Sequence, residues 1–275
     1  MRSATAENGS GFQAYAAPAT IAAAARLLAD GEAVLLAGGT DLMLGHDPGQ
    51  ARHLVNIGRI EALRGIEIGR NRIRIGALAT VSEVLEHDDL RRAAPLLAMT
   101  ADRFASPQIR NAATVGGNIA NASPAADMVV SLLALDAEVE LTAWRDGALT
   151  TRRLPLAEVI TGPGATVIAR DEILTTVDFA RPAEGHFGGF EKSGPRPALE
   201  IAVVSAALAG GFRDGALRNV RIALGAVAPT PIRAEAARVA AAEADPIDDV
   251  RGSAWYRRHL VSVYVGRLLA DALPG

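Results

Sequence analysis

The 275-residue chain contains no cysteine, and this absence excludes several kinds of chemistry. Disulfide bonds, iron–sulfur clusters bound by this chain and cysteine nucleophiles all require thiols. None of the histidines forms an i, i+4 pair or a recognisable metal-ligand pattern. They are His46, His53, His87, His186 and His259. The sequence therefore predicts no metal site in this chain.

The chain also lacks a surplus of positive charge and any long apolar run. Its 28 Lys and Arg residues stand against 31 Asp and Glu residues, which disfavours nucleic acid as a partner. No run approaches the ~20 apolar residues that a membrane span needs. Residues 1–11 are small and polar, unlike a secretory signal, and predict a frayed tail. We expect no membrane span and a cytoplasmic location.

The chain does have ample apolar material, 49% of its residues, for packed cores. Its length is near the size at which one core splits into several. A stretch rich in glycine and proline at residues 182–189 is the best candidate for a domain boundary. We therefore expect two domains, or three small lobes.

Hydrophobic periodicity and capping signals predict a mixture of helices and strands. Thr20 is a plausible N-cap, and Thr80 with Glu83 forms a potential capping box. Helices are predicted over residues 21–30, 80–87, 90–104, 126–135, 230–242 and 254–271. Strands are predicted at 33–37, 53–57, 72–75, 138–142, 172–179 and 216–224, with an apolar run at 199–209 and turns at 210–211 and 214–215.

The first of two glycine-rich segments, residues 37–42 (AGGTDL), follows a short apolar strand, and we call it loop one. Gly38 and Gly39 allow positive φ and remove the side chains that would hold a ligand away. Backbone N–H groups can then converge on an anion such as a diphosphate, and Thr40 adds a hydroxyl donor. An ordinary tight turn explains the same residues, so loop one alone leaves both interpretations open.

The second segment, residues 109–127 (IRNAATVGGNIANASPAAD), is more specific, and we call it loop two. It combines Gly116 and Gly117 with five small polar side chains and ends at Asp127, which opens the next helix. Apolar flanks predict that it is buried, where each polar group without a partner costs ~1–3 kcal/mol. A polar ligand would supply partners; in the alternative, the loop satisfies itself and Asp127 only caps the helix at Met128. The five side chains are Asn111, Thr114, Asn118, Asn121 and Ser123.

Neither loop contains a lysine or matches the G-x-x-x-x-G-K-[ST] pattern of nucleotide hydrolases. The order helix, strand, glycine turn around loop one also differs from the Rossmann order of strand, G-x-G-x-x-G and helix. A tightly held dinucleotide, with its charges met by backbone dipoles, fits both loops better than nucleotide hydrolysis does.

The two loops together resemble the FAD-binding medium subunit of the molybdenum hydroxylases, the xanthine dehydrogenase and carbon monoxide dehydrogenase family. The resemblance covers most of the chain and continues in FQAYAAPATIAAAARLL, FEKSGPRPALEIAVVSAAL and GAVAPTPIRA. It implies an α+β fold with a vanillyl-alcohol-oxidase (PCMH-type) FAD-binding domain over residues 1–180, made of two α+β lobes at about 1–60 and 61–180. A smaller C-terminal domain of the CO dehydrogenase flavoprotein type would follow over residues 181–275, with a three-stranded antiparallel sheet and helices.

The resemblance also implies which residues contact FAD. Leu174 would lie against the isoalloxazine ring, and Phe104 occupies the position of a ring-stacking aromatic. Lys192 and Glu200 would lie near the flavin as candidates for a catalytic role, and the charge of Lys192 would favour reduced flavin. Glu200 stands where the family often has Asp, which keeps the charge but lengthens the side chain. The remaining contacts would be Ala37, Gly38, Gly39, Thr40, Asp41 and Leu42 from loop one, and Thr114, Gly116, Gly117, Asn118, Ser123 and Asp127 from loop two.

Subunits of this family work in complexes. A large molybdopterin-binding subunit oxidises the substrate, and a small subunit with two [2Fe–2S] clusters passes electrons to FAD, which delivers them to NAD⁺, oxygen or a quinone. Because this chain has no cysteine and no visible molybdopterin motif, the resemblance places both groups on partner subunits. Two alternatives stay open: a stand-alone flavoprotein of the same fold, and a non-catalytic binding or scaffold subunit.

Overall fold

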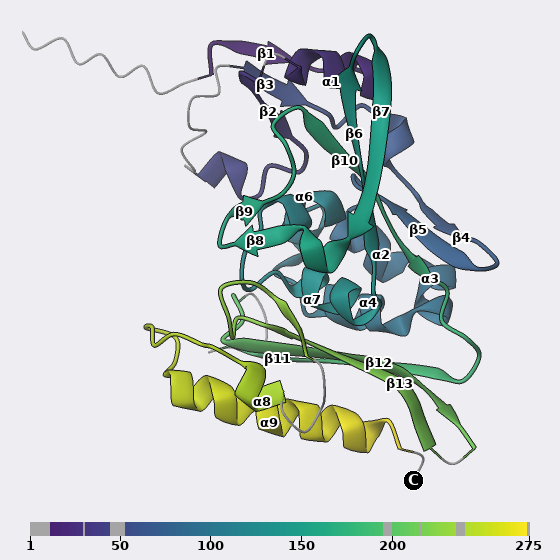
Figure 1. Ribbon diagram of the computed structural model, residues 1–275, viewed down its shortest axis with the longest axis vertical. Coiled ribbons are helices and arrows are strands. Elements are labelled where there is room, and N and C mark those ends of the chain that lie inside the picture. The colour runs from purple at the N-terminus through teal and green to yellow at the C-terminus, as the bar shows by residue number, and fades with distance from the viewer. Residues whose placement is uncertain are drawn as a thin grey trace, which may run out of the picture.

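The computed structural model describes residues 12–29, 31–44, 53–194, 200–214, 216–234 and 240–273. The predicted tail at residues 1–11, Asp30 and Gly215 lie outside these residues. Figure 1 shows an N-terminal lobe, a central lobe and a C-terminal sheet stacked along the long axis, with the terminal helix on the outer face of that sheet. Helices combined with mainly antiparallel sheets confirm the predicted α+β class.

The N-terminal lobe is built around a parallel three-stranded sheet with the order β1-β3-β2. Helix α1 begins at the predicted cap Thr20, whose side chain accepts a hydrogen bond from the amide of Ala23. The parallel pairing brings the ends of β2 and β3 to one edge of the sheet, so loop one emerges there. The elements are β1 (Ala14–Ala16), α1 (Ile21–Leu28), β2 (Ala33–Leu36), η1 (Leu42–Leu44), β3 (His53–Asn56) and η2 (Glu61–Leu63).

The central lobe contains an antiparallel sheet with the order β4-β5-β10-β6-β7. Strand β10 lies in its middle and carries Leu174 next to a register shift. The strands of the lobe are β4 (Ile66–Ile68), β5 (Arg72–Gly76), β6 (Glu138–Arg145), β7 (Ala148–Pro155) and β10 (Glu172–Ala180), with the small pair β8 (Ile160–Gly162) and β9 (Ala165–Thr166) and the turn η3 (Leu156–Glu158).

Six helices complete the central lobe, and local signals explain where two of them begin. Thr80 and Glu83 form the predicted capping box at the start of α2. The single helix predicted over residues 90–104 was wrong: Pro95 starts a new helix, because the residue before a proline is pushed out of the α region. The helices are α2 (Val81–Glu86), α3 (Asp88–Ala93), α4 (Pro95–Asp102), α5 (Pro107–Arg110), α6 (Val115–Ala120) and α7 (Asp127–Ala134).

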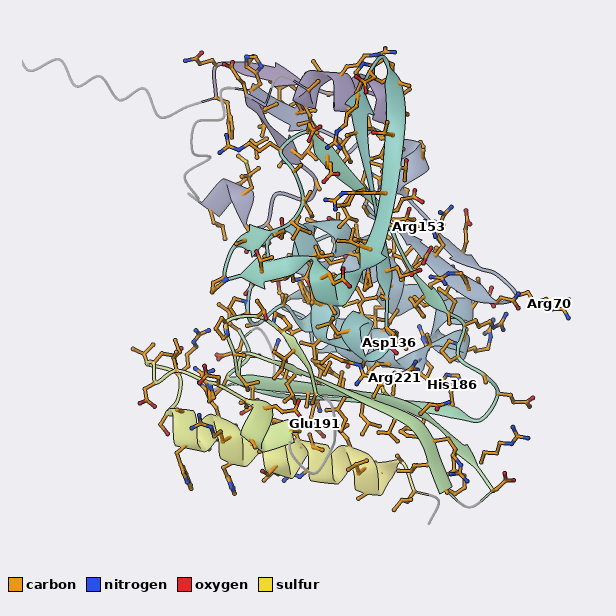
Figure 2. All side chains as sticks on the ribbon, in the orientation of Figure 1. Arg70, Asp136, Arg153, His186, Glu191 and Arg221 are labelled. Carbon is orange, nitrogen blue, oxygen red and sulfur yellow. The ribbon has the colours of Figure 1, made fainter. Side chains whose placement is uncertain are left out.

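The C-terminal part is a sheet with the order β11-β12-β13-β14, covered on both faces. Helices α4 and α7 of the central lobe contact one face, and α9 packs on the other. Asp136 and Arg221 lie where the sheet meets the central lobe (Figure 2). Asp136 accepts hydrogen bonds from Arg221 at 3.2 Å and from Arg233 at 3.1 Å. The elements are β11 (His186–Ser193), β12 (Val204–Arg213), β13 (Ala216–Gly225), β14 (Ile232–Ala234), α8 (Ala240–Glu243) and α9 (Ala254–Asp271).

The short strand β14 departs from two expectations. It adds a fourth strand to the sheet, which the family resemblance implied to be three-stranded. It also replaces the start of the helix predicted over residues 230–242, because Ile232 and Ala234 pair with β13. Tertiary pairing outweighs local helix propensity here, and Pro231 precedes a strand, a position that proline tolerates.

One predicted turn and the glycine- and proline-rich stretch at residues 182–189 also differ from the structure. Gly210 and Gly211 belong to β12 and do not form a turn. A Cβ at Gly210 would lie 2.7 Å from Phe187 Cζ, so the glycine makes room for an aromatic ring on β11. The loop predicted at residues 182–189 ends earlier, since β11 begins at His186.

Candidate functional site

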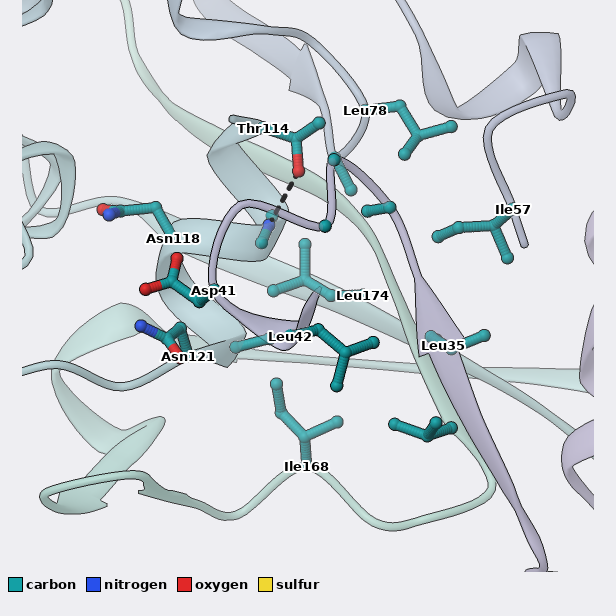
Figure 3. Close-up of a pocket in the computed structure, with 18 of the residues that line it drawn as sticks. Leu35, Asp41, Leu42, Ile57, Leu78, Thr114, Asn118, Asn121, Ile168 and Leu174 are labelled. Atoms are coloured by element: carbon teal, nitrogen blue, oxygen red, sulfur yellow. Dashed lines mark hydrogen bonds between the residues drawn. The ribbon is translucent and has the colours of Figure 1, made fainter. Parts of the chain in front are cut away.

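A cavity of about 470 Å³ lies between loop one and loop two (Figure 3). This volume is within the usual range of small-molecule sites. The polar side chains of Asp41, Asn118 and Asn121 lie together on one side of the cavity, while leucine and isoleucine side chains, including Leu35 and Ile57, lie on the other. The cavity therefore suits a ligand with both a polar and an apolar part.

Loop one forms a tight turn directly after β2. Gly39 has a φ of +70°, and the amide of Met43 closes the turn by donating to the Gly39 carbonyl at 3.1 Å. Within the described part of the chain, the amides of residues 38–42 have no protein acceptor. Successive free N–H groups in a glycine turn form a concave surface that binds anions. Loop one therefore offers an anion site made of backbone.

Gly38 sets the distance between the two loops. A Cβ built at Gly38 would lie 1.8 Å from the carbonyl oxygen of Ala112 and 2.7 Å from its carbonyl carbon. Ala112 belongs to loop two, so the backbones of the two loops are in direct contact. Only glycine permits this approach.

Loop two contains the end of α5 and all of α6, and it satisfies much of its own polarity. The Thr114 side chain caps α6 by accepting a hydrogen bond from the Gly117 amide at 3.1 Å. The Gly116 amide donates to the Ala77 carbonyl at 2.9 Å, and a Cβ at Gly116 would lie 2.7 Å from Ala77 Cβ. Loop two therefore offers the cavity side chains and not its first backbone amides.

Asn118 is a side chain of loop two that lines the cavity with a free acceptor. Its Oδ1 atom is buried and has no hydrogen-bond partner among the described residues. A buried acceptor without a partner costs about 1–3 kcal/mol, which a ligand hydroxyl would recover. Thr114 accepts its capping bond and keeps its own hydroxyl proton to donate. Both residues line the cavity, so this wall is ready for a polar ligand.

Asp127 and Lys192 form a buried ion pair between α7 and β11. Lys192 Nζ lies 2.5 Å from Asp127 Oδ2, and also donates to the Arg103 carbonyl at 3.3 Å. Burial raises the pKa of Asp127 to about 6, although Lys192 acts to lower it. Asp127 is the first residue of α7, and its other oxygen, Oδ1, has no partner among the described residues. The fold thus joins two predicted site residues, yet neither lines the cavity.

Ser123 and Glu200 also lie outside the residues that line the cavity. Ser123 Oγ accepts a hydrogen bond from the Ala125 amide at 3.2 Å and so closes the turn before α7. Glu200 is half-buried before β12. Their contact with a ligand stays a prediction.

Phe104 and Leu174 line the cavity together, as do Arg170 and Glu172, which the sequence interpretation missed. Arg170 is exposed and is the only cation among the described lining residues. The Glu172 carboxylate pairs with Arg152 at 2.7 Å. No local motif marks Arg170 or Glu172, because their place beside loop one follows from the pairing of β10 with β6.

Two of the described histidines, His87 and His259, stabilise local structure. His87 Nδ1 accepts a hydrogen bond from the Leu90 amide at 3.1 Å, and His259 stacks on Trp255 with ring centroids 5.5 Å apart. The described residues contain no group of three or more His, Asp or Glu side chains that could hold a metal ion. No helix among these residues is long and apolar enough to cross a membrane.

Comparison with known proteins connects this cavity to a cofactor. Residues 10–181 match the family described as "FAD binding domain in molybdopterin dehydrogenase", and residues 190–240 match the "CO dehydrogenase flavoprotein C-terminal domain". The chain belongs to the first of these families. It is therefore a flavoprotein subunit of an oxidoreductase of the molybdenum hydroxylase type, and its cofactor is FAD.

The similarity to individual relatives extends over nearly the full length of this chain. The chain is 33% identical to the xanthine dehydrogenase FAD-binding subunit of Escherichia coli, covering 95% of this chain and 96% of that subunit. It is 30% identical to the carbon monoxide dehydrogenase medium chain of Hydrogenophaga pseudoflava, covering 94% and 96%. Among solved structures, reconstituted CO dehydrogenase from Oligotropha carboxidovorans aligns with a TM-score of 0.89 at 30% identity, covering 95% of this chain and 98% of that chain.

The residues present fit FAD. The free amides of loop one suit its diphosphate, the Asn118 acceptor suits a ribityl or ribose hydroxyl, and the apolar side of the cavity suits its ring systems. The match of a PCMH-type FAD domain followed by a C-terminal domain agrees with the fold that the sequence resemblance implied.

Proposed function

We propose that the chain holds one FAD in this cavity and passes electrons from the [2Fe–2S] clusters of a partner subunit to NAD⁺, oxygen or a quinone. The observation that carries this proposal is the run of amides at residues 38–42 without a described protein acceptor, in the same cavity as the free acceptor of Asn118. When bound, FAD accepts electrons singly and releases them in pairs. The chain's own residues bind it, orient it and exclude water.

Each wall of the cavity has a separate task in this proposal. The amides of loop one and the Thr40 hydroxyl hold the diphosphate, and Thr114 and Asn118 of loop two hold sugar hydroxyls. Phe104 and Leu174 contact the isoalloxazine ring. Other contacts come from cavity-lining residues of the two loops, namely Ala37, Gly38, Gly39, Asp41, Leu42, Gly116 and Gly117.

Lys192 supplies a fixed positive charge close to the ring-binding end of the cavity. Its ammonium group lies against Asp127 and the Arg103 carbonyl, beside Phe104. A cation there favours additional electron density on the ring system. Asp127 Oδ1 is free to accept a further hydrogen bond. In our proposal Ser123 and Glu200 also lie close to the flavin.

The partners in this proposal are a molybdopterin-binding large subunit and a [2Fe–2S] small subunit. Several relatives are named medium subunit or medium chain, including the nicotine 6-hydroxylase medium subunit of Paenarthrobacter nicotinovorans, at 30% identity. Because this chain has no cysteine, clusters bound by thiolates must lie on another chain. We also propose a division into domains at residues 1–180 and 181–275, supported by the end of β10 at Ala180 and the start of a separate sheet with β11.

Purification from the native host tests the relay. We expect a yellow complex with one FAD for each copy of this chain, in which the organic substrate reduces the flavin only when both partner subunits are present. Single additions of NAD⁺, oxygen or a quinone to the reduced complex would identify the acceptor by the rate of flavin reoxidation. An isolated chain that turns over a small organic donor with oxygen would instead establish a stand-alone flavoprotein. A colourless chain that takes up no added FAD would establish a scaffold.

A further inference from the structure

The turn between α4 and α5 presents Phe104 to the cavity, and its backbone includes one unfavourable dihedral angle. Ala105, the next residue, has a φ of +33°, which is unfavourable for a residue with a Cβ. The Phe104 amide donates to the Ala101 carbonyl at 3.2 Å. Neighbouring side chains must therefore stabilise the turn.

Two cations hold the four successive carbonyls of this turn. Arg110 Nη1 lies 3.0 Å from the carbonyl oxygens of both Asp102 and Phe104, and 3.5 Å from that of Ala105. Lys192 Nζ donates to the remaining carbonyl, that of Arg103, at 3.3 Å. Hydrogen bonds from a charged donor are stronger than those between neutral groups. The backbone on both sides of Phe104 is thus fixed from outside the turn.

Arg110 also connects this turn to loop two. It is the last residue of α5, four positions before Thr114, and its side chain is half-buried and folds back over the start of its own helix. Its guanidinium carries several donors in a fixed plane. A single side chain therefore links the position of the Phe104 turn to the wall that carries Asn118.

We infer that Arg110 is a positioning residue that holds Phe104 against the bound FAD. This inference rests on the proposed function, which places Phe104 at the isoalloxazine ring. Arg110 itself is absent from the residues that line the cavity, so it acts through the turn and not by touching the cofactor. The single Nη1 atom at the end of the Arg110 side chain reaches all three of its carbonyl partners in the turn, so lysine at this position would keep the charge on a shorter side chain.

A double-mutant cycle on the purified full-length chain tests the inference. The variants are Arg110→Met, Phe104→Ala and the double substitution, and the readouts are the FAD dissociation constant and the shape of the visible absorption bands of bound FAD. We expect each single variant to bind FAD about tenfold more weakly, and the double variant to be no weaker than Phe104→Ala alone. Arg110→Lys should restore part of the affinity.

The control is Arg91→Met. Arg91 donates a hydrogen bond to the Leu85 carbonyl at 3.0 Å, so the variant also removes a bond from a guanidinium to a carbonyl, but neither residue lines the cavity. It should leave FAD affinity unchanged, and thermal unfolding of each variant shows whether it is folded. Losses that add in the double variant, or an Arg110→Met chain that binds like the parent, would overturn the inference while the proposed site stands. A Phe104→Ala chain with unchanged affinity and spectrum would overturn both the inference and the proposed place of Phe104. A parent chain without FAD binding would remove the proposed function itself.

Discussion

Replacing Gly38 with alanine tests the contact between the two loops most directly. The added Cβ would lie 1.8 Å from the Ala112 carbonyl oxygen, whereas Cβ atoms in real structures essentially never come within 3.0 Å of another heavy atom. The neighbour is backbone, so no side-chain rotation relieves the clash. The loops must separate by about 1 Å, and overpacking of this kind costs about 1–3 kcal/mol of folding free energy.

The same displacement affects the cofactor more than the fold. It moves the amides of loop one away from Asn118, so a ligand can no longer contact both walls with ideal geometry. Sites of this kind require placement within about 0.5 Å. We expect the FAD dissociation constant of Gly38→Ala to rise by about 10- to 100-fold, and thermal unfolding to occur several degrees lower.

Titration of the apoprotein with FAD, followed by flavin fluorescence, measures the affinity, and urea unfolding measures the stability. Gly162→Ala is the matched control, because a Cβ there would lie 3.8 Å from Ala165 Cβ, an ordinary contact. The control should match the parent in affinity. If Gly38→Ala binds FAD within about twofold of the parent, direct backbone contact between the loops does not shape the site.

Three further predictions follow from single side chains. Asn118→Ala should weaken FAD binding about tenfold by titration without lowering the stability of the apoprotein, because its Oδ1 has no described partner to lose; a destabilised apoprotein would contradict this. Arg257→Met should lower the free energy of unfolding, measured in urea, by about 3–5 kcal/mol. The reason is that Arg257 is 2% exposed and donates hydrogen bonds to Asp249 and to the carbonyls of Val203 and Ala226. A loss below about 1 kcal/mol would refute this prediction. Asp127, with a pKa raised from 3.8 to about 6, keeps its proton in the folded chain while the unfolded chain has released it. As the pH rises from 4 to 6, the free energy of unfolding of the parent chain should therefore fall relative to that of Asp127→Asn by roughly 1.4 kcal/mol per pH unit. A difference between the two chains that does not change with pH would refute the raised pKa.

Elements with strong local signals could be predicted from the sequence. Helix α9 has the predicted bounds, 254–271, because an amphipathic stretch follows Ser253, whose side chain caps it. The capping box at Thr80 is equally local. The failures occur where a distant partner decides the conformation. Ile232 joins a strand because β13 lies beside it, and Gly210 stays in a strand because Phe187 occupies the space of its Cβ.

The candidate site shows the same limit. Both glycine loops were recognisable, because their glycine pairs and small polar residues lie close together in the sequence. The cluster of Arg110, Lys192 and the Phe104 turn was not recognisable. Lys192 comes from β11, 89 positions after Arg103, whose carbonyl it contacts, and the packing of α4 on the C-terminal sheet brings the two together. Arg170 lines the cavity from a turn two residues before β10, where no local pattern marks it. Sequence patterns locate the walls of the cavity, whereas the tertiary fold determines which charges surround it.

The structure also reverses the relative weight of the two loops. Loop two has the more specific sequence, yet much of its polarity serves its own fold: Thr114 caps α6, and Ser123 closes a turn. Loop one was ambiguous as a sequence, yet it supplies the amides that lack described acceptors. Recognition by backbone needs only the glycines that shape it, so Thr40→Ala should weaken FAD binding far less than Gly38→Ala. A larger loss from Thr40→Ala would mean that its hydroxyl, and not the backbone of loop one, is the main contact with the diphosphate.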